Sequence, residues 1–184
     1  MSFQKILVAL DYSDLSQAVF AQALELAKTN ESHLMLLHCL ASEMISQPMV
    51  PIPTELGLYP EFMNPAYQEA QLTHVEKRVE QIRALLRSYC DAATSQGVRT
   101  TFDYKIGDAG QCLCQTARKW GAQLIVLGRR GRTGWTEALL GSVSNYVLHH
   151  APCSVLIIQA GVPHAVDSPP AAVGEGINPT QSLG

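Results

Sequence analysis

Glycines and a serine at distinctive spacing follow an apolar run in the last third of the chain. Residues 124–127 are Leu-Ile-Val-Leu, and after them come Gly128, Gly131 and, beyond nine intervening residues, Gly141 and Ser142. Glycine lets a backbone turn sharply and approach a ligand closely. A helix that begins there would offer free N–H groups and a partial positive charge to an anion. The spacing therefore predicts a phosphate-binding loop, although a glycine-rich connection with ordinary helix capping would use the same residues.

The pattern differs from two common phosphate-binding loops. No Gly-Lys-Ser/Thr follows the glycines, as a Walker A loop requires, and the Gly-x-Gly-x-x-Gly spacing of dinucleotide-binding folds is missing. The glycines also follow the fourth predicted strand instead of the first. Arg129, Arg130 and Arg132 lie within the loop and form either a solvated surface or a cationic clamp for phosphate.

Other residues with chemical potential also have structural interpretations. Asp11 follows the first apolar run and either caps the next helix or faces a ligand. His38 lies in a predicted buried strand, so we expect a hydrogen-bonded residue of the core or of a pocket edge. His149 and His150 end a predicted helix, where contacts to the terminal carbonyls are expected in preference to metal binding.

The cysteines are odd in number and show no Cys-x-x-Cys spacing. They are Cys39, Cys90, Cys112, Cys114 and Cys153. This usage is typical of reduced thiols in a cytoplasmic protein. A metal or redox pair of Cys112 and Cys114 is the alternative, but residues two apart on a helix point to different sides.

Apolar runs and helical periodicity alternate along the chain and define the elements that would position these residues. The predicted strands cover 4–10, 33–40, 98–106, 122–127 and 153–159. The predicted helices cover 14–29 with Ser13 as N-cap, 66–96 before Gly97, 109–120 with Asp108 as N-cap, and 141–150. This alternation predicts an α/β fold with a mostly parallel sheet. In such sheets ligands bind beyond the carboxyl ends of the strands, where the strand order reverses.

Two segments depart from this alternation. Residues 41–66 are rich in proline and methionine, which predicts a long irregular insertion. Residues 161–184 are rich in proline and glycine and poor in large apolar side chains, which predicts a disordered tail. The expected division is a domain over 1–160 and a tail over 161–184.

Charge and hydropathy exclude several classes of protein. The net charge is -3 and the pI about 6.0, which argues against a general nucleic-acid binder. No run of about 18 apolar residues is present, so no membrane span is expected. The first residues lead into a strand without a signal-peptide pattern, and we expect a cytoplasmic protein.

The segments around the glycines resemble the universal stress protein family. The likeness lies in residues 126–158, from Val-Leu-Gly-Arg-Arg-Gly to Ser-Val-Leu-Ile-Ile, and in the opening Ile-Leu-Val-Ala-Leu-Asp-Tyr-Ser of residues 6–13. Leu-Leu-His-Cys at 36–39 and Gly107-Asp108 are similar to the family's second strand and to the turn after its third. The resemblance covers about 1–40 and 67–160. It implies a Rossmann-like, five-stranded parallel sheet in the order 3-2-1-4-5, with helices on both faces and a nucleotide between strands one and four.

Members of the family that carry this glycine motif generally bind ATP. The resemblance therefore implies a role in the binding site for each matching residue. Ala9 and Leu10 would line the base pocket, Cys39 would hold adenine through its backbone, and Leu127 and Gly128 would flank the ribose. The implied residues near the phosphates are Asp11, Arg130, Gly131, Gly141, Ser142, Val143 and Ser144. Asp11 would act there directly or through a metal ion such as Mg²⁺ held by the nucleotide.

Two departures from the family pattern leave ligands other than ATP possible at the same site. Two arginines at 129–130 replace the smaller or different residues that are common there, and the 41–66 insertion is longer than in short family members. The expected function is an ATP-binding stress-response regulator, with AMP, ADP or cyclic AMP as alternative ligands of the same pocket. No general base is evident beside the phosphates apart from Glu137, so we expect no catalysis beyond slow ATP hydrolysis.

An ATP pyrophosphatase or nucleotidyl transferase of related architecture is a further alternative. Such enzymes carry a Ser-Gly-Gly-x-Asp-Ser loop after the first strand, whereas residues 11–14 are Asp-Tyr-Ser-Asp. The expected partners are a second copy of the chain, paired through residues 153–159, and an unidentified protein. The apolar edge of the fifth strand would otherwise be open to pairing.

Overall fold

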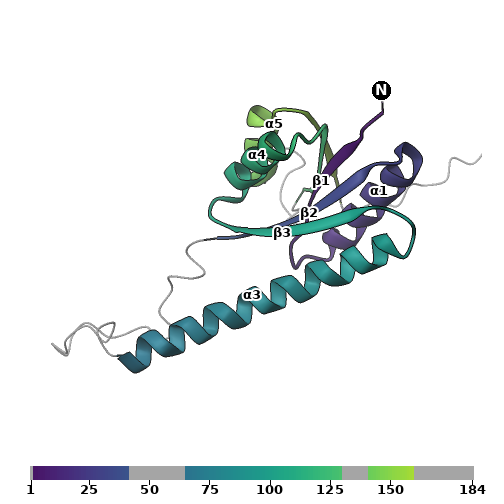
Figure 1. Cartoon of the computed structure of the whole chain (residues 1–184). Coiled ribbons are helices and arrows are strands. Elements are labelled where there is room, and N and C mark those ends of the chain that lie inside the picture. The colour runs from purple at the N-terminus through teal and green to yellow at the C-terminus, as the bar shows by residue number, and fades with distance from the viewer. Residues whose placement is uncertain (1, 42–64, 130–140, 160–184) are drawn as a thin grey trace, which may run out of the picture.

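Five parallel strands form one sheet in the order β3-β2-β1-β4-β5 (Figure 1). The computed structural model describes residues 2–41, 65–129 and 141–159. The strands are β1 Lys5–Ala9, β2 His33–Leu40, β3 Thr100–Ile106, β4 Leu124–Gly128 and β5 Ser154–Ile158. The helices are α1 Leu15–Asn30, α3 Pro65–Thr94, α4 Ala109–Trp120 and α5 Ser142–His150. The predicted α/β class and strand order are confirmed.

Alternation along the central strands divides the core into two layers. Ile6 and Val8 of β1 face a cluster that includes Val19 of α1 and Ile82 of α3. Leu7 faces the opposite cluster, whose members include residues of α4 and α5. Side chains of a strand point alternately to its two faces, so a strand covered by helices on both faces must be apolar throughout. The continuous apolar run that predicted β1 is therefore a consequence of its central position.

Helix α3 is longer than the sheet that it covers. It spans 30 residues, and its amino-terminal part extends beyond the sheet (Figure 1). Core contacts come from its second half, where Ile82, Leu86 and Ala93 are almost fully buried. Leu72 in the first half is 65% exposed. The helical periodicity thus predicted the helix, but part of its apolar stripe does not contact the sheet.

The predicted ends of α4 are confirmed in detail. The Asp108 side chain accepts a hydrogen bond from the backbone N–H of Gln111 at 2.8 Å, as an N-cap does. Gly121 ends the helix with a φ of 74°, a left-handed conformation that glycine adopts without a steric penalty.

The prediction that Ser13 caps α1 is wrong. Asp14 occupies the N-cap position, and it makes no side-chain capping bond. The hydroxyl of Ser13 instead donates to Asp11 Oδ1, as does its backbone N–H at 2.9 Å. These bonds form a turn around the Asp11 carboxylate, which holds Ser13 near the end of β1, one residue before the N-cap position.

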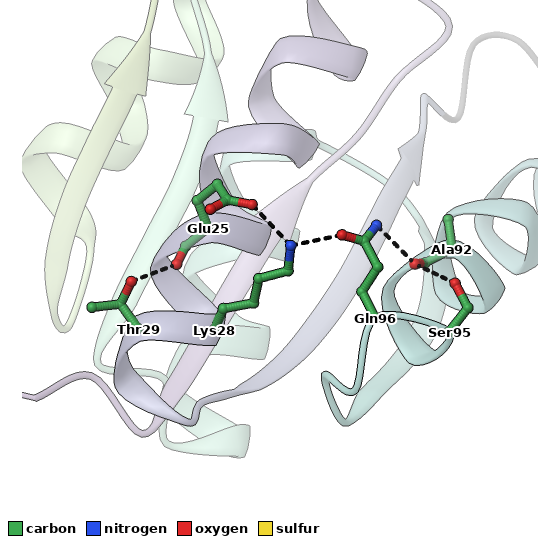
Figure 2. A network of polar contacts seen from close by, with 6 residues as sticks. All are labelled: Glu25, Lys28, Thr29, Ala92, Ser95 and Gln96. Atoms are coloured by element: carbon green, nitrogen blue, oxygen red, sulfur yellow. Dashed lines mark hydrogen bonds and ion pairs between the residues drawn. The ribbon is translucent and has the colours of Figure 1, made fainter.

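A polar network joins α1 to the end of α3 at the amino edge of the sheet (Figure 2). Lys28 Nζ donates to Glu25 at 3.0 Å and to Gln96 Oε1 at 2.6 Å. Gln96 and Ser95 both donate to the carbonyl of Ala92, and Thr29 donates to that of Glu25. A cavity of about 500 Å³ lies beside this network, at the edge opposite Asp11.

Several predictions fall outside the described residues. They concern residues 42–64 of the proposed insertion, the tail 161–184, and Arg130, Gly131 and Arg132 of the glycine-containing loop. The last two residues of the proposed insertion, Pro65 and Ala66, belong to α3. Among the helices that the structure describes, none is both long and apolar enough to span a membrane.

Candidate functional site

The strand order reverses between β1 and β4, and the ends of these two strands lie side by side. Val8 pairs with Val126 in the parallel register, so Asp11 and Gly128 follow at the same edge of the sheet. Open α/β sheets bind ligands at such a switch point because the connections leave in opposite directions and open a crevice. A single site between the first and fourth strands requires the carboxyl ends of these strands to be neighbours. The structure meets this requirement.

The carboxylate of Asp11 organises the turn from β1 into α1. Its Oδ1 accepts hydrogen bonds from Ser13 and from the hydroxyl of Ser16, the latter at 2.8 Å. The same Ser16 oxygen accepts the backbone N–H of Asp11 at 2.8 Å. Ser16 is buried, so this arrangement fixes the carboxylate at the edge of the sheet. A structural role for Asp11 is thus observed, while its role toward a ligand stays a prediction.

A small pocket lies between the end of β1 and the start of α1. The predicted residues Ala9, Asp11 and Gly128 line it, together with residues that the sequence analysis did not select: Ser13, Leu15, Ser16 and Val19. Its volume of about 30 Å³ is well below the ~300 Å³ minimum of typical ligand pockets. The predicted phosphate loop continues into residues 130–140, outside the described part of the chain. The sequence could have indicated Ser13 and Ser16, because their hydroxyls follow Asp11 by two and by five residues.

Gly128 packs closely against side chains of α1. A Cβ there would lie 2.7 Å from Leu15 Cδ2 and 3.2 Å from Val19 Cγ2. Real Cβ atoms essentially never come within 3.0 Å of another carbon, so a larger residue would require the Leu15 side chain or α1 to shift. Glycine at the end of this strand therefore brings α1 against the candidate site.

Helix α5 begins beside the end of β4. Gly141 is its N-cap residue and has no side chain to cap the helix, while its carbonyl accepts the N–H of Asn145 at 2.9 Å. The first N–H groups of a helix have no partner within the helix. Ser144 is 2% exposed, and its hydroxyl donates to the carbonyl of Gly128 at 3.3 Å. This bond ties the amino end of α5 to the strand that carries the candidate loop.

The model of the universal stress protein family matches residues 2–159 of the chain. The chain belongs to this family. It is 38% identical over 163 residues to the universal stress protein Sll1388 of Synechocystis, an alignment that covers 86% of this chain and 99% of the relative.

Solved structures share the fold of this universal stress protein at low sequence identity. The structure of MJ0577 has a TM-score of 0.69 at 18% identity and covers 88% of this chain and 99% of its own. A universal stress protein in complex with cAMP has a TM-score of 0.56 at 21% identity, covering 86% and 98%. The Archaeoglobus fulgidus protein in complex with dAMP has a TM-score of 0.54 at 18% identity, covering 85% and 98%.

The residues implied for the base side of this universal stress protein are mostly buried. Leu10 and Leu127 are 3% and 2% exposed and belong to opposite core layers, so only their backbones are available to a ligand. Cys39, near the end of β2, is half-buried. Val143 packs against the second core layer, and Ser142 is exposed.

His38 is the hydrogen-bonded core histidine that the sequence predicted. Its Nδ1 lies 2.9 Å from the carbonyl oxygen of Leu10, so Nδ1 carries the hydrogen. Burial lowers the pKa of His38, while the hydrogen bond with Leu10 and the charge of Asp11 oppose that shift. Tyr12, 60% exposed, packs edge-on against this ring with centroids 5.4 Å apart. An exposed aromatic ring therefore adjoins the candidate site, which the sequence analysis did not anticipate.

Of the two terminal histidines, His150 makes the expected contact with a helix carbonyl. His150 Nδ1 lies 2.9 Å from the carbonyl oxygen of Tyr146, one turn earlier in α5. Cys114 is buried in the second core layer, whereas Cys112 is half-buried on another side of α4. All five cysteines are free thiols, and the described residues contain no group of three or more side chains suited to a metal ion.

Proposed function

We propose that this universal stress protein is an adenine-nucleotide-binding regulator whose ligand is ATP. The observation that carries the proposal is the reversal of strand order between β1 and β4, with α5 tied to Gly128 beside it. A switch point with an uncapped helix start suits an anionic nucleotide. The cAMP and dAMP complexes of two proteins with this fold support the adenine part of the proposal.

In this proposal the base and phosphates occupy opposite sides of the crevice. The base would contact Ala9 and the backbones of Leu10 and Cys39, with the ribose beside Leu127 and Gly128. The phosphates would contact the first turn of α5, from Gly141 through Ser142 and Val143 to Ser144. Arg130 and Gly131 would complete the phosphate contacts from outside the described residues.

Asp11 would approach the phosphates through Mg²⁺. Carboxylate and phosphate oxygens together are the ligands that Mg²⁺ prefers. Asp11 is the described carboxylate that lines the pocket between β1 and α1. Catalysis is not part of the proposal beyond slow hydrolysis of ATP.

A sensor of AMP or cyclic AMP is the second candidate. It is favoured by the two solved complexes of related folds, which hold the monophosphates cAMP and dAMP. A monophosphate would need only the first turn of α5, whereas ATP would extend along the loop toward residues 130–140.

We also propose that the protein acts as a homodimer in the cytoplasm, paired through β5. The two edges of the sheet differ in charge. Edge strand β3 carries Asp103 and Lys105, which form an ion pair with an N–O distance of 2.5 Å. Edge strand β5 is uncharged, and residues 155–158 are only half-buried. Charges on an edge discourage strand pairing, so β5 is the edge suited to a second copy.

Calorimetric titration of nucleotide-stripped protein tests the ligand. We expect micromolar binding of ATP with Mg²⁺ and a loss of at least about tenfold in the Gly141→Val variant, equivalent to ~1.4 kcal/mol. A Cβ at Gly141 meets no atom of the described residues within 4 Å, and its φ of -57° is ordinary, so this variant should fold. Gln96→Ala, at the opposite edge, is the matched control and should bind normally.

Tighter binding of AMP or cyclic AMP than of ATP would favour the second candidate. Equal, tight binding of ATP by the native and Gly141→Val proteins would contradict the assignment of the phosphates to α5. Absence of binding for all three nucleotides would contradict the proposal as a whole.

A further inference from the structure

Two cysteines that are distant in the sequence meet beside the candidate site. Cys39 lies near the carboxyl end of β2, opposite Lys105 of β3, and Cys112 lies in the first turn of α4. The Cys112 thiol lies close enough to Cys39 to help raise its pKa. The sequence analysis considered Cys112 with Cys114, whereas the structure brings Cys112 to Cys39.

The backbone around both sulfurs is well anchored. Gly107 donates its N–H to the carbonyl of Leu40 at 2.9 Å, which holds the chain entering α4 against the end of β2. Asp108 then caps α4, and its carbonyl accepts the N–H of Cys112 at 2.9 Å. A Cβ on Gly107 would lie 3.3 Å from Cys112 Sγ. The backbone on both sides therefore holds Cys112 close to the end of β2, where Cys39 lies.

We propose that Cys39 and Cys112 are a modification site, at which a peroxide joins them in a reversible disulfide. The peroxide transfers one oxygen to a sulfur, which gives a sulfenic acid and releases water or an alcohol. The second sulfur then attacks the sulfenic sulfur, the S–S bond forms, and the oxygen leaves as water with the thiol's proton. Two thiols are oxidised by two electrons in total, and the peroxide O–O bond is reduced.

The surroundings of the two sulfurs decide the order of the steps. Burial, followed by the adjacent Cys112, raises the pKa of the Cys39 thiol to about 12, so Cys39 stays protonated at neutral pH. The thiolate is the form that attacks a peroxide. Cys112 is therefore the sulfur oxidised first, and Cys39 resolves the sulfenic acid. Contact between the two sulfurs compensates for the weak acidity of Cys39 in the second step.

The other cysteines lack this arrangement. Cys90 Sγ donates to the carbonyl of Thr100 at 3.4 Å. Cys153 and Cys114 are near enough for the charge of one to affect the pKa of the other, but burial is the larger cause of the raised pKa of Cys153. That pair serves as an internal control.

The disulfide would act on the nucleotide site, and this part of the inference rests on the proposed function. A disulfide needs an S–S distance of about 2.05 Å, shorter than any contact between thiols. Forming it would pull the end of β2 toward α4, and the backbone of Cys39 is the proposed contact for adenine. We therefore expect oxidation to weaken adenine-nucleotide binding by at least about fivefold, the lower end of typical coupling between sites.

The test treats the reduced full-length protein with hydrogen peroxide and maps its peptides by mass spectrometry without reduction. The expected product is a Cys39–Cys112 peptide pair that has lost two hydrogen atoms and that dithiothreitol separates. Cys112→Ser should give no such pair, and Cys153→Ser should give it as readily as the native protein. Calorimetric titration with ATP, AMP and cyclic AMP is then run on reduced, oxidised and re-reduced protein, and on both variants after peroxide.

Each outcome decides a separate point. A failure to find the Cys39–Cys112 pair, or a preference for Cys114–Cys153, would overturn the modification site. A clean disulfide with unchanged nucleotide affinity would overturn its effect on the site. If the reduced protein binds no nucleotide, the proposed function fails, while the peptide map still decides the disulfide.

Discussion

The hydroxyl of Ser144 donates a hydrogen bond to the carbonyl of Gly128, 3.3 Å away. It joins the first turn of α5 to the end of β4, across the segment that the sequence predicts to hold phosphate. Because Ser144 is buried, the bond is shielded from water and fixes where α5 begins. The Ser144 side chain thus sets where α5 begins relative to β4, and its hydroxyl is already hydrogen-bonded to Gly128.

Replacing Ser144 with alanine should lower both stability and nucleotide affinity. The variant leaves the Gly128 carbonyl without this donor, which we expect to cost about 1 kcal/mol in the free energy of unfolding. Urea unfolding measures that loss, and ATP titration of the same protein should show weaker binding. Ser142→Ala is the stability control, because Ser142 is exposed. Equal stability of the two variants would contradict the role of the Ser144–Gly128 bond.

Alanine at Gly128 and at Gly141 should have different effects. At Gly128 the new Cβ collides with Leu15, so we expect a loss of about 1–3 kcal/mol in unfolding free energy. At Gly141 no atom in the described part of the chain lies within 4 Å of the new Cβ, and Gly141→Ala should unfold at nearly the native denaturant concentration. Urea unfolding of both variants decides the point. A Gly128→Ala protein as stable as the native one would mean that α1 moves aside without penalty.

The fold was predictable because its signals are local. Buried parallel strands require uninterrupted apolar runs, and Asp108 and Gly121 mark the ends of α4 in the manner of general capping rules. The meeting of Asp11 and Gly128 also followed, because it depends only on the strand order that the family resemblance implied. The structure confirms that order.

The details of the site depend on contacts that sequence spacing does not reveal. Ser13 and Ser16 both donate to the Asp11 carboxylate, so α1 is preceded by a turn around this carboxylate where a Ser13 cap was predicted. Contact between Cys39 and Cys112 arises only when α4 packs over the end of β2. Neither spacing nor helical periodicity could rank Cys39 above Cys114 as the neighbour of Cys112.

A lysine on β5 should separate the proposed dimer. Val155→Lys places like charges on the two paired strands, the device by which natural sheet edges avoid pairing. We expect the dissociation constant to rise by at least about tenfold, or ~1.4 kcal/mol. Light scattering after size exclusion, at micromolar protein and with or without nucleotide, measures it. Thr101→Lys on the β3 edge is the matched control and should remain dimeric. A native protein that is monomeric in both nucleotide states would refute the dimer.

Stability should decline on acidification because His38 is buried. Burial lowers the pKa of His38 below its ordinary value of 6.5, so the unfolded chain binds the proton more readily than the folded one. The unfolding free energy should therefore be steady above pH 6.5 and fall as the pH drops from 6.5 through the lowered pKa. His33 adds a loss of the same sign, since burial and then the charges of Arg99 and Lys5 lower its pKa.

Urea unfolding at pH values between about 5 and 8 separates the two histidines. His38→Gln keeps a donor for the Leu10 carbonyl but removes the titration, so its stability should fall less steeply below pH 6.5 than that of the native protein. His33→Gln should flatten the curve separately, and the double variant should show the smallest dependence. If His38→Gln follows the native curve in parallel across this range, His38 takes up its proton equally well in the folded and unfolded chains, and its burial does not govern the acid sensitivity.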